Sequence, residues 1–191
     1  MNIFLKRIFS NIPTLETKRL ILRGITIKDT ADMYEYSKDP AVTKYLLWKE
    51  HQSQNETKRH ISFLQKKYAS GEFYDWGITL KETGKFIGTV GFSDINTDHR
   101  RGEIGYVLNP AFWNKGIAAE AAAAVIEFGF FDLDLNRIEA RHMDGNNASA
   151  AVMKKCGMTY DGTLEKYMFV KNEFKTIHVY SVLKENYKSW R

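Results

Sequence analysis

The spacing of hydrophobic residues changes several times along the chain, and each change predicts a different element. In residues 17–26, hydrophobic and polar positions alternate, which is typical of a half-buried strand. Helical spacing then predicts a helix over 29–39, a further helical stretch around 42–47, and a longer helix over 55–69 that ends at Gly71. The first strand is therefore followed by an α-α segment.

Beyond Gly71 the hydrophobic period falls to two, which predicts strands. We expect strands at 76–80, 86–92, 103–108, 137–142, 159–170 and 175–183, with helices after Gly116 and over 147–155. The order is β-α-α-β-β-β-α-β-α-β-β, which predicts a mixed α/β (α+β) domain with a central twisted sheet of about seven strands. The strand-helix-strand unit over 103–142 implies a parallel pair with a right-handed crossover. Ligands tend to bind at the carboxyl ends of such strands, here near Leu108 and His142.

The segment around Gly116 is the first candidate for a functional site. A strand ends at Asn109, a loop of small residues follows, and helical spacing begins at Ile117. The first turn of a helix leaves backbone N–H groups without partners at the positive end of the helix dipole, and small residues such as Ala118 and Ala119 leave room for an anion. This pattern predicts a phosphate-binding loop, with a plain turn as the alternative. It matches neither the P-loop nor the dinucleotide-binding pattern of glycines.

Composition narrows the class of protein and of partner. The chain has 191 residues, of which 43% are hydrophobic, which suits one domain with a substantial core. The net charge of +5 favours anionic partners such as a polyanionic cofactor, RNA or an acidic surface, although a plain solvated basic surface explains it as well. The single cysteine, Cys156, excludes an intrachain disulfide and favours a cytoplasmic location. The histidines have no metal-binding spacing, so we expect no metal.

Residues 1–14 are expected to form an arm that precedes a domain at 15–191. Hydrophobic residues surround Lys6 and Arg7 in this arm, at Ile3, Phe4, Leu5, Ile8, Phe9 and Ile12. A short helix or arm packed on the domain or on a partner subunit is expected, which leaves a homodimer open. The arm lacks the continuous apolar core of a signal sequence, and no stretch has membrane-spanning length, so we expect no membrane attachment.

Three stretches resemble one family. They are Trp-Asn-Lys-Gly-Ile-Ala-Ala-Glu at 113–120, Glu-Ile-Gly-Tyr at 103–106 with Asn-Pro at 109–110, and Asn-Asn-Ala-Ser at 146–149 followed by Lys-Cys-Gly-Met at 155–158. Together with Leu-Glu-Thr-Lys-Arg-Leu-Ile-Leu-Arg at 15–23, they resemble the GNAT superfamily of acetyl-coenzyme A (acetyl-CoA) dependent N-acetyltransferases. Within it they resemble the Rim-type branch, the ribosomal-protein N-terminal acetyltransferases. The resemblance spans roughly residues 15–183.

The resemblance implies where acetyl-CoA, the co-substrate, would bind. Backbone groups of 113–119 would hold its diphosphate, and the strand edge at 107–108 would pair with its pantetheine arm like an extra strand. Asn146 would hydrogen-bond the arm, and Lys115 or Lys155 would meet phosphates. The acetyl group would sit where the parallel strands splay apart, with a backbone N–H near Leu108 as oxyanion donor. The implied cofactor-binding residues are Val107, Leu108, Trp113, Asn114, Lys115, Gly116, Ile117, Ala118, Ala119, Asn146, Ser149 and Lys155.

Two residues are candidates for proton transfer. Glu103 could take a proton from the amine through a water molecule, and the alternative is a strand-end carboxylate paired with Arg101 or Arg137. Many members of the family have a tyrosine seven residues after the asparagine, but here that position is Met153. Ser149 is the substitute candidate for the acid, and the alternative is a hydroxyl that binds backbone at the start of a helix.

The basicity of the amine indicates which class of acceptor a weak base can serve. An α-amine with a pKa near 7.8 is roughly one-tenth neutral at pH 7, whereas a lysine near 10.4 is neutral at about four parts in ten thousand. A weak base suffices for the α-amine, which favours a peptide N-terminus or a small amine over a lysine side chain. The Rim-type resemblance implies a protein N-terminus of the ribosomal-protein type, attacked directly in a ternary complex. The alternatives are a small-molecule amine (polyamine, amino acid or antibiotic), a non-catalytic acyl-CoA sensor and, on charge alone, an RNA-binding protein. We expect no DNA partner.

Overall fold

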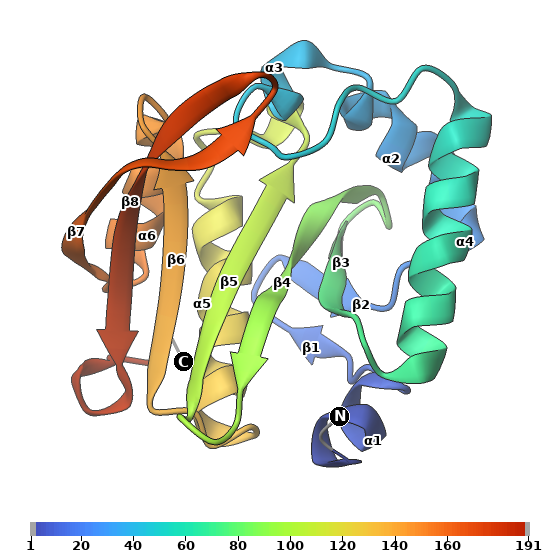
Figure 1. Cartoon of the computed structure of the whole chain (residues 1–191). Coiled ribbons are helices and arrows are strands. Elements are labelled where there is room, and N and C mark those ends of the chain that lie inside the picture. Colours follow the sequence, from blue (N-terminus) through green and yellow to red (C-terminus); the bar gives the residue numbers. More distant parts are fainter. Residues whose placement is uncertain (1–2, 190–191) are drawn as a thin grey trace.

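A mixed sheet of eight strands runs through the centre of the structure, in the order β1-β2-β3-β4-β5-β6-β8-β7 (Figure 1). The structure is a computed structural model that describes residues 3–189. The strands are β1 (Leu15–Glu16), β2 (Leu20–Arg23), β3 (Tyr74–Leu80), β4 (Phe86–Asn96), β5 (Arg101–Leu108), β6 (Arg137–Met143), β7 (Thr159–Val170) and β8 (Glu173–Leu183). The helices are α1 (Ile3–Phe9), α2 (Thr30–Ser37), α3 (Pro40–Thr43), α4 (Gln54–Ser70), α5 (Ile117–Phe131) and α6 (Asn147–Lys155).

The predicted fold class is confirmed, because the chain forms one mixed α/β domain with a parallel central pair, β5 and β6. The sheet has eight strands instead of about seven because the chain turns back at Thr17. The Thr17 N–H donates to the Leu20 carbonyl at 3.0 Å, and this turn lays the two-residue β1 beside β2. The first predicted strand, 17–26, is therefore shorter than expected and is preceded by an extra edge strand.

The predicted helical stretch around 42–47 is wrong in its position. Helix α3 begins earlier, at Pro40, whose ring fixes the φ angle of the first helical residue. Asp39 caps this helix by accepting a hydrogen bond from the Ala41 N–H at 2.8 Å. The Asp39-Pro40 pair thus ends one helix and starts the next, and residues 44–53 form turns and irregular structure instead.

The central strands separate partway along their length. Strand β5 pairs with β6 only from Arg101 with Arg137 to Ile104 with Ala140. Beyond that point β5 keeps its pairing with β4, up to Leu108, while β6 continues beside β8. The predicted splay of the central pair is therefore present, and the edge of β5 over 105–108 has no strand beside it on the β6 side.

Helices lie on both faces of the sheet. Helix α5 lies behind β4, β5 and β6 in Figure 1, and most of its residues are buried, including Val125, Ile126 and Phe130. Full burial of a side chain of this size contributes about 1.5–3 kcal/mol, so α5 is a rigid support for its own first turn. On the opposite face, α2 and α4 pack against β4 through a separate core cluster. Among residues 3–189, no helix is long and apolar enough to cross a membrane.

Helix α1 packs against this same core. Phe9 is fully buried, and its ring meets those of Tyr74, Trp76 and Phe128 edge to face at centroid distances of 4.7, 5.7 and 6.2 Å. Such pairs add about 0.5–1.5 kcal/mol each beyond their buried area. The N-terminal segment therefore contributes directly to the core between β3 and α5.

Candidate functional site

A cavity of about 470 Å³ opens where β5 leaves β6, between the start of α5, helix α6 and residues 41–46. Eleven of the twelve predicted cofactor-binding residues line it, namely Val107, Leu108, Trp113, Asn114, Gly116, Ile117, Ala118, Ala119, Asn146, Ser149 and Lys155. Three separate sequence motifs thus meet around one space. The twelfth residue, Lys115, does not line the cavity.

The start of α5 forms the part of the wall at which an anion would bind. Gly116 precedes the helix with a φ of +73°, which residues with a side chain rarely adopt. The first N–H groups of the helix have no intrahelical acceptor and belong to residues that line the cavity. Each charge-assisted hydrogen bond from them is worth about 1.5–3 kcal/mol. This wall fits a diphosphate, and the unpaired edge of β5 fits an extended amide-containing arm.

The side chain of Lys115 is directed elsewhere. Its Nζ donates to the Ala111 carbonyl at 2.9 Å and lies 5.4 Å from the centre of the Phe112 ring. The ammonium group therefore stabilises the turn that precedes the loop. Of the two lysines expected to meet phosphates, only Lys155, in the last turn of α6, borders the cavity.

Arg19 and Glu120 brace the loop from outside, and sequence reasoning missed this arrangement. Glu120 accepts hydrogen bonds from Thr17 Oγ1 at 2.6 Å, from Arg19 N at 2.8 Å and from Arg19 Nε at 2.6 Å. Arg19 Nη1 then donates to the Lys115 carbonyl at 2.9 Å. Burial raises the pKa of Glu120, but these hydrogen bonds outweigh it and hold the pKa below its ordinary value. The contact joins residues a hundred positions apart, so local patterns do not reveal it.

The part of the cavity wall formed by residues 41–46 is held in place by contacts between segments far apart in the sequence. Tyr45 donates its hydroxyl hydrogen bond to the Gly145 carbonyl at 3.0 Å, and Lys171 Nζ at the tip of the β7-β8 hairpin donates to the Thr43 carbonyl at 2.8 Å. Asn146 Oδ1 caps α6 by accepting from Ser149 N at 3.3 Å. The cap uses only the oxygen of the Asn146 amide, so its NH₂ group is the part suited to a ligand.

Tyr106 and Ser149 form a hydroxyl pair inside the cavity. The two hydroxyl oxygens are 2.9 Å apart, and Tyr106 Oη also lies 2.9 Å from the Ser149 carbonyl. Burial raises the pKa of Tyr106, so its proton stays on at neutral pH. Met153, by contrast, is buried in the core and has no proton to give. Tyr106 was missed as a site residue, although its place in the resembling strand motif was a signal.

Glu103 lies outside the cavity lining. It sits five residues before Leu108 on β5, about 17 Å along the strand. Its carboxylate is 3.1 Å from Arg141 Nε, so the sequence-based alternative of pairing with Arg101 or Arg137 names the wrong partner. Those two arginines pair with Asp94, and with Glu139 and Asp161, respectively. Burial raises the pKa of Glu103, and Arg141 opposes that shift.

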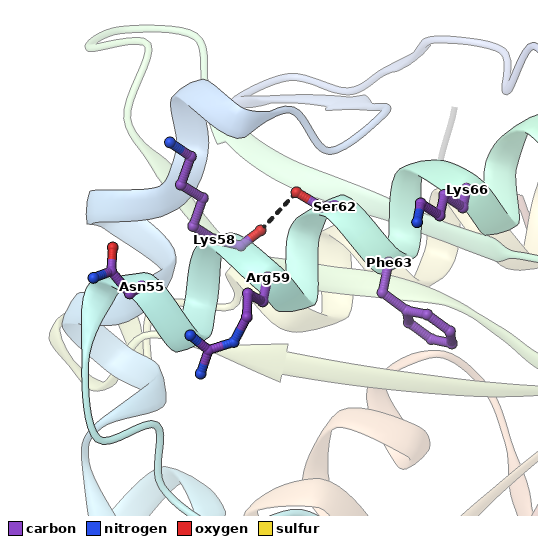
Figure 2. Close-up of a pocket in the computed structure, with 6 residues that line it drawn as sticks. All are labelled: Asn55, Lys58, Arg59, Ser62, Phe63 and Lys66. Atoms are coloured by element: carbon purple, nitrogen blue, oxygen red, sulfur yellow. Dashed lines mark hydrogen bonds between the residues drawn. The ribbon is translucent and has the colours of Figure 1, made fainter.

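A second hollow lies on the outer side of α4 (Figure 2). It is lined by Asn55, Lys58, Arg59, Ser62, Phe63 and Lys66. Ser62 uses its hydroxyl to donate to the Lys58 carbonyl of the same helix at 3.0 Å. All lining residues come from one face of one helix, so this hollow does not enclose a ligand as the β5-α5 cavity does.

Metal and thiol chemistry have little support in the side-chain positions. No group of three or more histidine, cysteine, aspartate or glutamate side chains within residues 3–189 is placed to hold a metal ion. Cys156 is buried, its Sγ lies 3.5 Å from the Ala119 carbonyl, and burial raises its pKa to about 12. It behaves as a small hydrophobic residue.

Comparison with known proteins supports an acetyl-CoA site in this cavity, because the matching family and relatives are acetyltransferases. Residues 19–159 match the model of the acetyltransferase (GNAT) domain. The uncharacterised N-acetyltransferase YoaA of Bacillus subtilis is 35% identical over 172 residues, which cover 90% of this chain and 97% of that protein. YdaF of the same organism, provisionally named a ribosomal N-acetyltransferase, is 27% identical over 147 residues, 76% of this chain and 79% of its own.

A solved structure extends the likeness to three dimensions. The GNAT-family acetyltransferase from Bacillus anthracis superimposes with a TM-score of 0.81 at 29% identity. The match covers 91% of this chain and 99% of that chain. The β5-α5 loop and the splayed strands lie within residues 19–159, the range that matches the family model.

Proposed function

The chain belongs to the acetyltransferase (GNAT) domain family, and we propose that it acetylates the α-amine of a protein N-terminus by direct attack in a ternary complex. Like other members, it is an N-acetyltransferase with acetyl-CoA as co-substrate. When bound, acetyl-CoA supplies the acetyl thioester. The first turn of α5, from Gly116 to Ala119, holds the diphosphate, and the free edge of β5 at Val107 and Leu108 holds the pantetheine arm.

The observation that carries the choice of acceptor is the state of Glu103. Glu103 lies outside the cavity lining and is paired with Arg141, so it can take a proton from the amine only through water, which suits an α-amine better than a lysine. An α-amine is about one-tenth neutral at pH 7 and needs little help. The resemblance to the Rim-type branch and the provisional name of YdaF support the same acceptor.

Proton return to the leaving thiolate is assigned to the hydroxyl pair. Ser149, at the start of α6, gives its proton to the leaving thiolate and recovers one from solvent water, while Tyr106, which donates to the Ser149 carbonyl at 2.9 Å, holds the Ser149 hydroxyl in place. This pair replaces the tyrosine that is absent at Met153. A backbone N–H of β5 near Leu108 stabilises the charge that develops on the thioester oxygen.

Replacement of Tyr106 by Phe tests this assignment. We expect Tyr106→Phe to lower kcat about tenfold, below the usual range for general acids because Ser149 and water still donate. Calorimetry should show unchanged acetyl-CoA affinity, since the backbone contacts stay. Ser149→Ala should give a similar loss, and the double variant should lose little more than either single one. Independent, multiplicative losses would show that the two hydroxyls do not act as a unit.

Glu103→Gln tests the relayed base. We expect a loss in kcat/KM of no more than about tenfold at pH 7, because one-tenth of the α-amine is already neutral, and a larger loss at lower pH. The measurement is the pH–rate profile against an N-terminal peptide. Identical profiles for wild type and variant would remove Glu103 from the reaction.

The function as a whole is tested by titration and turnover. The protein is titrated calorimetrically with acetyl-CoA, and thiol release is then followed with N-terminal peptides, lysine peptides and polyamines. Release on N-terminal peptides supports the proposal. Release only on polyamines would establish the small-molecule alternative, and binding without release on any amine would indicate an acyl-CoA sensor.

A further inference from the structure

A row of three residues crosses the sheet next to the proposed reaction site. Asp75 on β3 pairs in register with Gly91 on β4, and Gly91 pairs with Gly105 on β5. Residues directly opposite each other on neighbouring strands share a face. Here it is the face opposite α5, because the next residue after Asp75, Trp76, belongs to the α5-side core. The row ends one residue beyond Ile104, where β5 and β6 separate.

The space over the sheet is open at Gly105 and is filled by Asp75 at Gly91. Gly105 is exposed, and a Cβ at this position would meet no atom within 4 Å. A Cβ at residue 91 would instead overlap Asp75 Oδ1 and the backbone of β3. The Asp75 carboxylate therefore lies beside Gly91, about 5 Å, or one strand spacing, from the open space over Gly105.

The Asp75 carboxylate has no counter-charge. Its side chain is half-buried, and no hydrogen bond or ion pair formed among residues 3–189 reaches its carboxylate oxygens. Burial alone raises its pKa to about 7. A carboxylate held in this way destabilises the folded chain when it is ionised, so it is a feature that stability alone does not favour.

The groups around Asp75 do not supply the missing charge. Tyr36 on α2 and Tyr68 on α4 interact with it electrostatically, and burial raises the pKa of each hydroxyl, so both stay neutral. Tyr68 donates its hydrogen bond to the Asp75 main-chain oxygen at 2.5 Å, not to the carboxylate. No cation contributes to the raised pKa of Asp75, and Arg23, on the neighbouring strand β2, binds Asp29 at 2.7 Å.

We propose that Asp75, whose carboxylate lies over Gly91, binds the acceptor as an ammonium ion in the open space over Gly105, and so makes the enzyme select positively charged primary amines over neutral ones. The inference rests on the function proposed above and names its acceptor chemistry. At pH 7 about nine-tenths of an α-amine is protonated, so a site for the ammonium form captures most of the acceptor. The proton then leaves through the relay at Glu103. Asp75 acquires its counter-charge only when the acceptor is present.

The test replaces Asp75 by the isosteric Asn, with Asp98→Asn at the exposed β4-β5 turn as the matched control. Steady-state rates are measured with an N-terminal peptide and with trifluoroethylamine, whose fluorine atoms keep the amine largely neutral at pH 7. Loss of one charge-assisted hydrogen bond should raise KM for the peptide about 10- to 100-fold and leave kcat within a few-fold. The KM for trifluoroethylamine should stay unchanged, as should every constant of Asp98→Asn.

The pH dependence provides a readout that a structural role would not produce. In wild type, KM for the peptide should rise as the pH falls below about 7, because Asp75 becomes protonated and neutral. The Asp75→Asn variant should show no such rise. Because the folded pKa of this acid is raised, its ionisation destabilises the fold most fully above pH 7. The variant should therefore melt at a higher temperature than wild type at pH 8.

A binding experiment separates this inference from the function on which it rests. Protein labelled with ¹⁵N and saturated with coenzyme A is titrated with ethylamine. The amide signals of Gly91 and Gly105 should shift in wild type and in Asp98→Asn, but not in Asp75→Asn. No shift in wild type, or an unchanged peptide KM in Asp75→Asn, would overturn the ammonium site. Failure of wild type to bind acetyl-CoA would overturn the proposed function instead.

Discussion

Replacement of Gly116 by Glu is expected to weaken acetyl-CoA binding by at least about 100-fold, the equivalent of two lost charge-assisted hydrogen bonds. The new carboxylate would stand at the first turn of α5, where the N–H groups that should meet the diphosphate begin. The φ of +73° would also strain any residue with a side chain by about 1–2 kcal/mol. Titration calorimetry with acetyl-CoA measures the effect, and circular dichroism should show a retained fold.

The β3-β4 turn offers a matched control for this substitution. Gly84 has nearly the same backbone angle, with φ of +69°, and a Cβ there meets no atom within 4 Å. Gly84→Glu introduces the same strain and the same charge at a residue that does not line the cavity, so its affinity for acetyl-CoA should equal that of wild type. Equal affinity in both variants would contradict the assignment of the α5 loop, and equal loss in both would point to a global effect of strain.

Glu120→Ala is expected to lower the free energy of unfolding by about 2–3 kcal/mol. The substitution leaves Thr17 Oγ1 and the Arg19 backbone N–H without their acceptor, and the side chain of Glu120 is only 13% exposed. The ion pair itself adds little, because the Arg19 side chain is 43% exposed. Urea unfolding measures the loss. Glu82→Ala, at an exposed position of the β3-β4 turn, is the control and should change stability by less than about 0.5 kcal/mol.

The same carboxylate gives a pH signature. The pKa of Glu120 is lowered in the folded protein, so its stabilisation is present above the ordinary value of 4.5 and is lost as the pH falls through the folded value. The stability difference between wild type and Glu120→Gln should therefore be full at pH 7 and shrink in acid below pH 4.5. A difference that is constant with pH would show that the hydrogen bonds do not depend on the charge.

Much of the fold could be predicted because its signals are local. Helices α4, α5 and α6 and the β7-β8 hairpin follow from hydrophobic spacing and from glycines of positive φ, such as Gly71 after α4 and Gly157 after α6. The edge strand β1 was missed because a strand of two residues is too short to show an alternation of hydrophobic and polar positions. Helix α3 was misplaced because a proline that ends one helix can equally begin the next.

The site could be predicted only where its residues lie close together in the sequence. The loop over 113–119 lies within one strand-helix unit, so its position beside the end of β5 follows from topology. Arg19, Tyr45 and Asp75 act across long sequence separations, and their roles depend on which strands pair in which register. Alternation and spacing contain no such information, and three-dimensional structure was needed to find them.

The buried position of Cys156 has a practical consequence for measuring this enzyme. The chain contains one cysteine, and its raised pKa of about 12 leaves almost no reactive thiolate at neutral pH. In the folded state, thiol reagents should therefore detect the coenzyme A released by turnover and almost nothing from the protein. In denaturant, the same reagents should gain one reactive group per chain, so Cys156 doubles as a built-in probe of global unfolding.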